Sequence, residues 1–230
     1  NIAKVSPPNS IQLTSDGSQT VHSGRFNIQY HSIHGAITES EHVFIDAGLK
    51  ARIATTEEDS LHIVEMGLGT GLNAFLALRE ANLRPDITFQ YTAIEKYPLE
   101  QPLITQLTYA STLGLPQVGF SKIHDGEWGA SQMVSPNFEL KKVKGSWLDV
   151  AGSLPLADVI FYDAFAPNAQ PELWTEEAMQ ICADLLKPGG CWVSYCAKGS
   201  VKRALKAAGL QVEALPGPPR KREMTRAWKT

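Results

Sequence analysis

Three glycines that alternate with other residues form the motif most suggestive of chemistry. Gly67, Gly69 and Gly71 lie in EMGLGTG, between the apolar run LHIVEM and LNAFLALREANL, whose apolar residues recur at helical spacing. Glycine lets the backbone turn tightly and approach a ligand closely. The order E-x-G-x-G-x-G differs from the G-x-G-x-x-G of dinucleotide-binding loops, and no Gly-Lys-Ser/Thr ending follows. We therefore expect a ligand-binding loop that is not built for a pyrophosphate or a triphosphate.

Two carboxylates follow the loop at places where an open α/β sheet binds its ligand. Glu95 ends the segment ITFQYTAIE, and a carboxylate there can accept both hydroxyl hydrogens of a ribose. Asp149, in GSWLDV, is expected to approach the edge of an adenine. In a simpler interpretation the glycines only form a tight turn and the acids are solvated loop charges.

The glycine loop followed by an acid at the next strand resembles the class I S-adenosylmethionine-dependent methyltransferases. The resemblance implies that the three glycines run under the methionine part of the cofactor and that Glu65 positions the loop and the methionine ammonium. It also implies that Glu95 holds the ribose and that Asp149 contacts the adenine amino group. S-adenosyl-L-methionine is therefore the expected cofactor, and we expect no metal.

Asp163, at the end of the apolar run VIFYD, is the candidate catalytic residue. Methylation of an amine needs the neutral lone pair, because an alkylammonium, with a pKa of roughly 10, has no electrons to offer the methyl group. Asp163 could accept an N–H of the amine, offset the charge that develops and pass on a proton. Phe165, Pro167 and Trp174 would form pocket walls that hold the nitrogen ~3–3.5 Å from the methyl carbon. In the alternative, Asp163 caps a turn and the aromatic residues are plain core.

Three longer segments carry a closer resemblance. YDAFAPNAQPELWT, ESEHVFIDAGL and PGPPRKREMTRAW together resemble the tRNA 5-methylaminomethyl-2-thiouridine methyltransferases, over roughly residues 20 to 230. The resemblance implies methyl transfer to the aminomethyl nitrogen of 5-aminomethyl-2-thiouridine at wobble position 34 of tRNA. The family has a bifunctional form with a flavin-dependent oxidase. Because the chain ends at Thr230, we expect the stand-alone methyltransferase, without flavin and supplied by upstream wobble-uridine modification enzymes.

Three other functions remain open on the sequence. An aminopropyltransferase of the spermidine synthase type shares this sheet and uses an Asp beside a sulfonium cofactor. A small-molecule N-methyltransferase is a second alternative, and a non-catalytic RNA-binding module that kept the fold is a third. Binding of S-adenosylhomocysteine would separate an enzyme from such a module.

The elements that must position these residues alternate between strands and helices from Leu61 onward, which is typical of an α/β sheet with right-handed crossovers. We expect a Rossmann-like class I methyltransferase sheet of about seven mostly parallel strands, closed by an antiparallel pair over QVEALPG and MTRAWK. One helix is expected over PLEQPLITQLTYASTLG, ended by Gly114, and another over TEEAMQICADLLKPGG, capped by Thr175. Residues 1–57 are interpreted as an N-terminal appendage and residues 58–230 as the methyltransferase domain.

Composition narrows the class of protein further. Hydrophobic residues make up 43% of the 230 residues and charged residues 20%, which excludes a disordered chain. No segment has the ~20 apolar residues of a membrane helix, and the first residues are too polar for a signal peptide, so we expect no membrane contact and a cytoplasmic protein. The three cysteines are expected to be buried reduced thiols, and the histidines at 31, 34 and 42 to be surface or hydrogen-bonded residues.

The formal net charge of −3 hides a strong asymmetry along the chain. Residues 198–230 hold nine basic and two acidic residues, a local charge of +7, which leaves −10 for the rest. A basic end beside the ligand crevice would suit phosphates of a tRNA anticodon stem-loop. We assign this role to the cluster Arg220, Lys221, Arg222 and Arg226, which follows a Pro-Gly-Pro-Pro turn.

Overall fold

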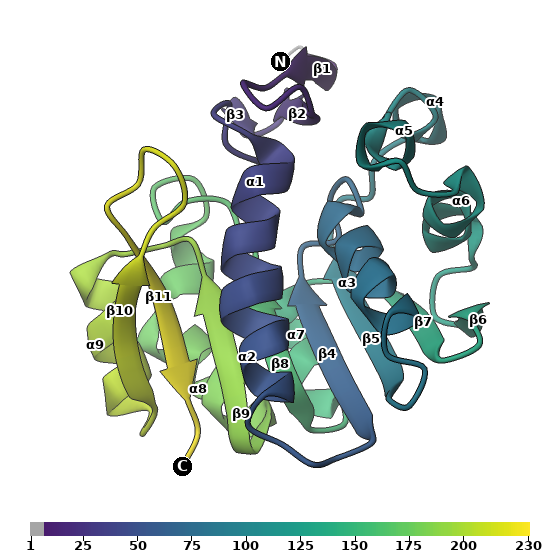
Figure 1. Cartoon of the computed structure of the whole chain (residues 1–230). Coiled ribbons are helices and arrows are strands. Elements are labelled where there is room, and N and C mark those ends of the chain that lie inside the picture. Colours follow the sequence, from purple (N-terminus) through teal and green to yellow (C-terminus); the bar gives the residue numbers. More distant parts are fainter. Residues whose placement is uncertain (1–6) are drawn as a thin grey trace.

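Eight strands form one sheet through the centre of the molecule in the computed structural model, which describes residues 7–230 (Figure 1). Residues 1–6 of the predicted appendage lie outside the described residues. The strands are β4 (Ser60–Met66), β5 (Thr88–Glu95), β6 (Ser131–Ser135), β7 (Phe138–Lys144), β8 (Ala157–Tyr162), β9 (Leu186–Ser194), β10 (Gln211–Pro216) and β11 (Glu223–Trp228). Their order is β10-β11-β9-β8-β4-β5-β7-β6.

Five neighbouring strands of this sheet, from β9 to β7, run parallel. The closing pair β10–β11 is antiparallel, as the sequence predicts, and β11 is also antiparallel to β9. The mostly parallel α/β sheet is confirmed, with eight strands instead of about seven. The additional strand, β6, pairs antiparallel with β7 at the edge of the sheet and comes from a stretch without a clear periodic pattern.

Helices cover both faces of the sheet, because its strands alternate between two apolar clusters. Ile63 of β4 and Phe161 of β8 face one cluster, while Val64 and Tyr162 face the other. The helical elements after β4 are α3 (Leu72–Asn82), α4 (Gln101–Ile104), α5 (Tyr109–Leu113), α6 (Gln117–Asp125), α7 (Trp147–Val150), η2 (Ala151–Ser153), η3 (Pro171–Trp174), α8 (Glu176–Leu185) and α9 (Gly199–Ala207).

Two predicted helices differ in detail from the observed ones. The segment expected to form one helix before Gly114 contains two short helices, α4 and α5, although Gly114 does end the second in a left-handed conformation, with φ of +65°. Thr175 caps α8, and its Oγ1 accepts the Ala178 N–H at 3.2 Å. The residues after Leu185 enter β9 directly, so Pro188 lies in a strand and does not close the helix.

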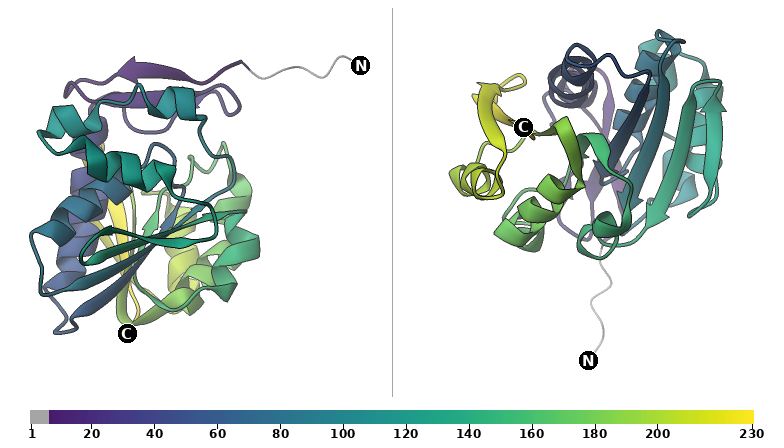
Figure 2. Two further views of the ribbon diagram at one scale, coloured as in Figure 1. Left: turned by 90° about the vertical axis from the view of Figure 1, so that its right-hand side faces the viewer. Right: turned by 90° about the horizontal axis from the view of Figure 1, so that it is seen from below.

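The N-terminal segment has two parts. The strands β1 (Ser10–Leu13), β2 (Gln19–Ser23) and β3 (Ile28–Gln29) form a small antiparallel sheet at the end of the molecule where α4 and α5 also lie (Figure 2). The Tyr109 hydroxyl joins them by donating to the Gln19 carbonyl at 2.7 Å. A continuous helix follows, formed by α1 (Ala36–Ser40), η1 (Glu41–Lys50) and α2 (Ala51–Ile53), and crosses the face of the large sheet (Figure 1).

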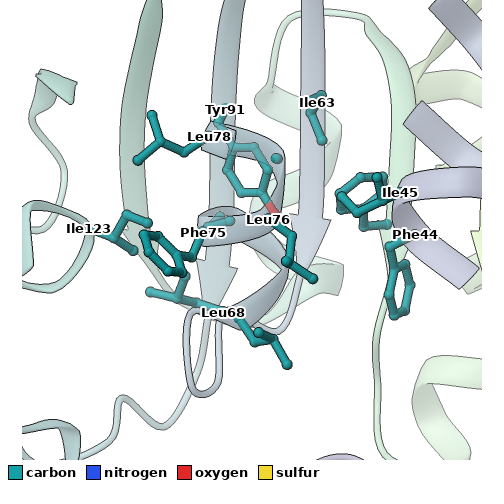
Figure 3. Packing of buried hydrophobic residues seen from close by; sticks show 14 of the residues in the cluster. Phe44, Ile45, Ile63, Leu68, Phe75, Leu76, Leu78, Tyr91 and Ile123 are labelled. Atoms are coloured by element: carbon teal, nitrogen blue, oxygen red, sulfur yellow. The ribbon is translucent and has the colours of Figure 1, made fainter. Parts of the chain in front are cut away.

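This helix shares its apolar core with the sheet. The Phe44 ring lies 5.4 Å from that of Phe161, and Phe44 and Ile45 point toward the strands from the helix (Figure 3). A Cβ at Gly48 would come within 2.8 Å of Val193 Cγ2, so glycine permits the close approach of helix and sheet. Residues before and after the predicted boundary at residue 57 therefore pack in one hydrophobic core.

Other predictions concern exposure and membrane contact. Cys182, Cys191 and Cys196 are free and buried, as predicted. Within residues 7–230, no helix has both the length and the apolar character needed to cross a membrane.

The packing of the long helix predicts a large effect of one truncation. We expect Phe44→Ala to lower the free energy of unfolding by about 3–5 kcal/mol, because it leaves a cavity between helix and sheet. Leu83→Ala, at a side chain that is 69% exposed, serves as the control and should change it by less than about 0.5 kcal/mol. Urea unfolding of both variants measures the difference. Equal stabilities would contradict a shared core.

Candidate active site

Three parallel strands end side by side, and their register brings the predicted site residues together. Met66 of β4 pairs with Ile94 of β5 on one side and with Tyr162 of β8 on the other. The residues that follow these three paired residues therefore lie at the same edge of the sheet. They are Gly67, Glu95 and Asp163. Backbone hydrogen bonds continue past the strands, from Gly67 N to Ile94 O at 2.9 Å and from Asp163 N to Met66 O at 3.1 Å. A cavity at this edge is lined by all three residues.

The glycine loop needs its glycines for two physical reasons. Gly67, Gly69 and Gly71 all have positive φ, at 92°, 50° and 75°. There is also no room for a side chain, since a Cβ at Gly69 would lie 2.8 Å from the Tyr30 ring and one at Gly71 would lie 2.6 Å from His124 Nε2. Gly67 and Gly69 line the cavity, whereas Gly71 is the N-cap of α3. The loop therefore presents bare backbone to the cavity.

Two histidines from distant parts of the chain hold Thr70 of this loop. His31 Nε2 lies 2.9 Å from Thr70 Oγ1, and His124 Nε2 lies 3.1 Å from the Thr70 carbonyl. Burial lowers the pKa of each imidazole to about 4, so both are neutral at pH 7. The prediction that His31 is a hydrogen-bonded residue is confirmed, and the residue also lines the cavity together with Tyr30.

One amide bridges the two carboxylates nearest the centre of the sheet. Asn73, on the first turn of α3, donates from Nδ2 to Glu65 Oε1 at 3.0 Å and to Asp163 Oδ2 at 2.9 Å. Glu65 is fully buried, and its burial together with the Asp163 charge raises its pKa well above the ordinary value. Glu65 Oε2 and Asn73 Oδ1 are buried without a hydrogen-bond partner among residues 7–230. The bridge ties the base of the glycine loop to the candidate catalytic acid.

Asp163 sits in surroundings that favour its protonated form. Burial, followed by the charge of Glu39, raises its pKa from 3.8 to about 8, while the hydrogen bond from Asn73 and the charge of Lys221 oppose this rise. A cation placed beside the carboxylate would favour ionisation. The ionisation of Asp163 therefore depends on whether a cationic group lies beside it.

Glu95 already orders the backbone around it. Its Oε2 accepts the Gly69 N–H at 3.0 Å and its Oε1 accepts the Tyr97 N–H at 2.7 Å. Each carboxylate oxygen keeps a free lone pair, so the group can still accept from the two hydroxyls of a ribose. Burial raises its pKa, and the backbone N–H groups of Tyr97, Gly69 and Lys96 act in the opposite direction.

The structure does not bring Asp149 into the cavity wall. Asp149 lies on α7 with an exposed side chain, and the neighbouring residues Ser146, Trp147 and Leu148 line the cavity instead. Ser146 is the N-cap of α7 and the first two helical residues line the cavity with it, whereas the third, Asp149, is exposed to solvent. The contact of Asp149 with adenine remains a prediction.

The three residues predicted to form the pocket wall have different places in the structure. Phe165 lines the cavity, in ring contact with Tyr30 at 5.0 Å. Trp174 is buried behind it and donates from Nε1 to the Phe165 carbonyl at 2.8 Å, so it holds the wall without lining the cavity. Pro167 borders a neighbouring hollow, together with Tyr195 and Lys221.

The predicted basic cluster is also divided. Arg220 and Arg222 are exposed, and Arg222 borders the same hollow as Pro167. Lys221 pairs with Glu39, and its ammonium lies 4.3 Å from the centre of the Tyr195 ring. Arg226 is held by Glu213 at 2.7 Å and by the Ala47 carbonyl at 3.0 Å. Arg226 therefore joins β11 to β10 and to the long helix, because β10 places Glu213 directly opposite it. Its contact with tRNA phosphates remains a prediction.

Some residues of the site were not found from the sequence. Asn73 follows the glycine loop by two residues, and this proximity was the available signal. Ser146 and Trp147 directly follow a predicted strand end. Among residues 7–230 no group of three side chains could hold a metal ion.

S-adenosylmethionine fits the residues that line the cavity. Gly67 and Gly69 present bare backbone to the cavity, and Glu95 has free lone pairs for ribose hydroxyls. Glu65 is fully buried and does not line the cavity, so its contact with the methionine ammonium remains a prediction. The acids Glu95 and Asp163, which line the cavity, suit a ligand with an ammonium and a sulfonium. Once bound, this cofactor supplies an electrophilic methyl group.

The close packing around Gly69 in the glycine loop predicts that a methyl group added at this residue lowers the affinity for the cofactor. Gly69→Ala should raise the Kd for S-adenosylhomocysteine by about tenfold or more, equivalent to about 1.4 kcal/mol, because the residue has positive φ and touches Tyr30. Gly152→Ala, where a Cβ meets nothing within 4 Å, is the matched control. Calorimetric titration of both variants measures the change. Unaltered affinity in Gly69→Ala would remove the loop from the cofactor site.

The raised pKa of Asp163 predicts a pH-dependent stability. Below pH 3.8 both folded and unfolded chains are protonated at this residue, whereas between about 4 and 8 only the folded chain keeps the proton. The stabilisation present at low pH is therefore lost as the pH rises toward 8. Asp163→Asn keeps an oxygen that can accept from Asn73 and should gain stability relative to the wild type as the pH rises from 4 to 9. Urea unfolding at several pH values measures the free energy of unfolding of both proteins. If Asp163 were ionised throughout this range, the plots of this free energy against pH would be parallel for the wild type and the variant.

The comparisons with known proteins agree with this geometry. Residues 138–230 match a family model described as S-adenosyl-L-methionine-dependent methyltransferase. The chain is 32% identical over 217 residues to the tRNA 5-methylaminomethyl-2-thiouridine biosynthesis bifunctional protein MnmC of Methylobacillus flagellatus, covering 88% of this chain and 33% of the relative. The MnmC of Pseudomonas entomophila is 30% identical, with 90% of this chain and 33% of the relative covered. The chain thus spans about a third of the length of these curated relatives.

A solved structure shares the fold over almost the whole chain. The crystal structure of MnmC2 from Aquifex aeolicus superposes with a TM-score of 0.82 and 22% identity, covering 99% of this chain and 72% of that one. The sheet order, the glycine cradle at the end of β4 and the matched family model lead to one conclusion. The chain has the fold of the class I S-adenosyl-L-methionine-dependent methyltransferases, and its residues 138–230 match a family model of that description.

Proposed function

We propose that this methyltransferase acts on the aminomethyl nitrogen of 5-aminomethyl-2-thiouridine at wobble position 34 of tRNA. The observation that carries the proposal is the half-buried carboxylate of Asp163, which faces the cavity from the end of β8 and is held by Asn73 at 2.9 Å. Support for the nucleoside comes from the relatives, whose names place them in the biosynthesis of 5-methylaminomethyl-2-thiouridine in tRNA. The family match favours methyl transfer over aminopropyl transfer.

Asp163 is suited to handle both the charge and the proton of an amine. The substrate nitrogen is an ammonium at neutral pH, and the acids around the cavity attract it. Once the ammonium has given one proton to solvent water, the Asp163 carboxylate accepts a remaining N–H of the neutral amine and orients the lone pair. As the nitrogen bonds to the methyl carbon and the carbon–sulfur bond breaks, the nitrogen becomes positive. The nearby carboxylate stabilises this charge and can accept the proton that the product releases.

The substrate side of the cavity combines an apolar wall with free cations. Phe165 lines the cavity next to Asp163, with Trp174 as its support. Arg220 and Arg222 lie exposed on the β10–β11 loop and supply positive charge for the phosphates of an anticodon stem-loop. We include Lys221 as a partner in this surface, although it is already paired with Glu39. Enzymes that install the aminomethyl group would act upstream on the same nucleotide.

The decisive experiment is methyl transfer to undermodified tRNA by Asp163→Asn. We expect kcat to fall by roughly 10²–10⁴, the usual contribution of a positioned acid or base, with the Kd for S-adenosylhomocysteine nearly unchanged. Asp86→Asn, an exposed carboxylate at the start of β5 and thus at the opposite edge of the sheet, is the control. Nucleoside analysis of the product tRNA should show 5-methylaminomethyl-2-thiouridine for the wild type and the control. Full turnover by Asp163→Asn would exclude Asp163 from the chemistry.

A further inference from the structure

We propose that the turn between β2 and β3, residues 24–27, forms the seat for the substrate nucleotide, with Phe26 stacking on the nucleobase and Arg25 binding an adjacent phosphate. The inference rests on the proposed function, because it takes the substrate to be a single nucleotide of an RNA that enters the cavity base first. It assigns a binding role to the N-terminal sheet, which the catalytic argument does not use.

The aromatic rings at the mouth of the cavity form one continuous group. The Phe26 ring lies 4.9 Å from that of Phe165 and 5.8 Å from that of Tyr97. All three residues line the cavity that also contains Asp163. Since Phe165 follows Asp163 by two residues, a base held against these rings has its exocyclic substituent within reach of the carboxylate. Unpaired RNA bases bind to proteins by stacking on such rings.

Two cations stand over the same aromatic group and are available to a ligand. The Arg25 guanidinium lies 4.3 Å from the centre of the Tyr97 ring and the Lys96 ammonium lies 5.4 Å from it. Both residues are exposed, and neither forms an ion pair with another of residues 7–230. The interior of the cavity is acidic, so a phosphate is favoured at the rim and disfavoured inside. This polarity fits a nucleotide that inserts its base and leaves its phosphate outside.

The turn that carries Arg25 and Phe26 is held in one conformation by its own hydrogen bonds. Phe26 N donates to Ser23 Oγ at 3.2 Å and Asn27 N donates to the Ser23 carbonyl at 2.8 Å. Gly24 N donates to the Asn9 side chain at 3.0 Å. Asn27 has φ of +53°, a left-handed conformation that is uncommon outside glycine. Such a turn can present a ring to a ligand with little entropy to lose on binding.

The test compares tRNA and cofactor binding in variants of the turn. Phe26→Leu keeps an apolar side chain but removes the ring, and should raise KM for undermodified tRNA by about tenfold, within the range for loss of one base–aromatic stack. Phe26→Tyr keeps the ring and should stay within about twofold of the wild type. Arg25→Gln should reduce the slope of log KM against log salt by about one, as expected for one lost phosphate contact. Lys206→Gln, at the end of α9 remote from the cavity mouth, removes the same charge and should leave the slope unchanged.

The outcomes separate this inference from the proposed function. No turnover of undermodified tRNA by the folded wild type would overturn both. Wild-type turnover with an unchanged KM in Phe26→Leu and an unchanged salt slope in Arg25→Gln would overturn the nucleotide seat alone. A raised Kd for S-adenosylhomocysteine in Phe26→Leu, with KM for tRNA unaltered, would make Phe26 a cover for the cofactor instead.

Discussion

The register of three parallel strands is the constraint on which the site depends. Because Met66, Ile94 and Tyr162 are paired neighbours, the residues that follow them leave the sheet together, as a glycine and two acids. A shift of one residue in either pairing would turn the alternating side chains of a whole strand to the other face of the sheet. It would also remove an acid from the cavity. The apolar residues on both faces of β4 and β8 therefore maintain the chemistry as well as the fold.

Holding acids at this edge has an energetic cost that the local structure partly offsets. Glu65 is buried beneath α3, where a carboxylate is disfavoured unless it is hydrogen-bonded or protonated. Asn73 supplies one donor to Glu65 and one to Asp163, which leaves each acid only partly satisfied. Under the proposed function, the substrate ammonium would supply the missing positive charge beside Asp163. Incomplete hydrogen bonding of buried acids lowers the stability of the folded chain, and binding sites commonly carry such a loss of stability.

Much of this arrangement could be predicted from the sequence, and the reasons are local. The glycine loop, Glu95 and Asp163 each follow an apolar run, and parallel strands end at one edge, so their convergence needed no knowledge of distant contacts. The contacts of the N-terminal segment with the glycine loop could not be predicted in this way, because Tyr30 and His31 reach Gly69 and Thr70 across almost forty residues.

Other differences arose where a residue type has several uses. A count of charges along the chain does not distinguish Arg222, which is exposed, from Arg226, which the register of β10 and β11 pairs with Glu213. In the same way, Trp174 looks like a pocket wall in the sequence, but its indole N–H is used to brace the Phe165 backbone. Asn73 lies in α3 between Leu72 and the apolar residues 74–78, and its bridging role depends on two strands meeting beneath it.

The contact between the N-terminal sheet and the glycine loop couples two binding events. Tyr30 and His31 touch the loop from one end of a short segment, and Phe26 stands at the cavity mouth near its other end. A ligand that orders the loop would therefore also order the segment that we propose as the seat of the nucleotide. Since such coupling is reciprocal, each substrate should bind more tightly in the presence of the other. The enzyme would then favour the ternary complex over either binary complex, and would release both products more readily once one has left.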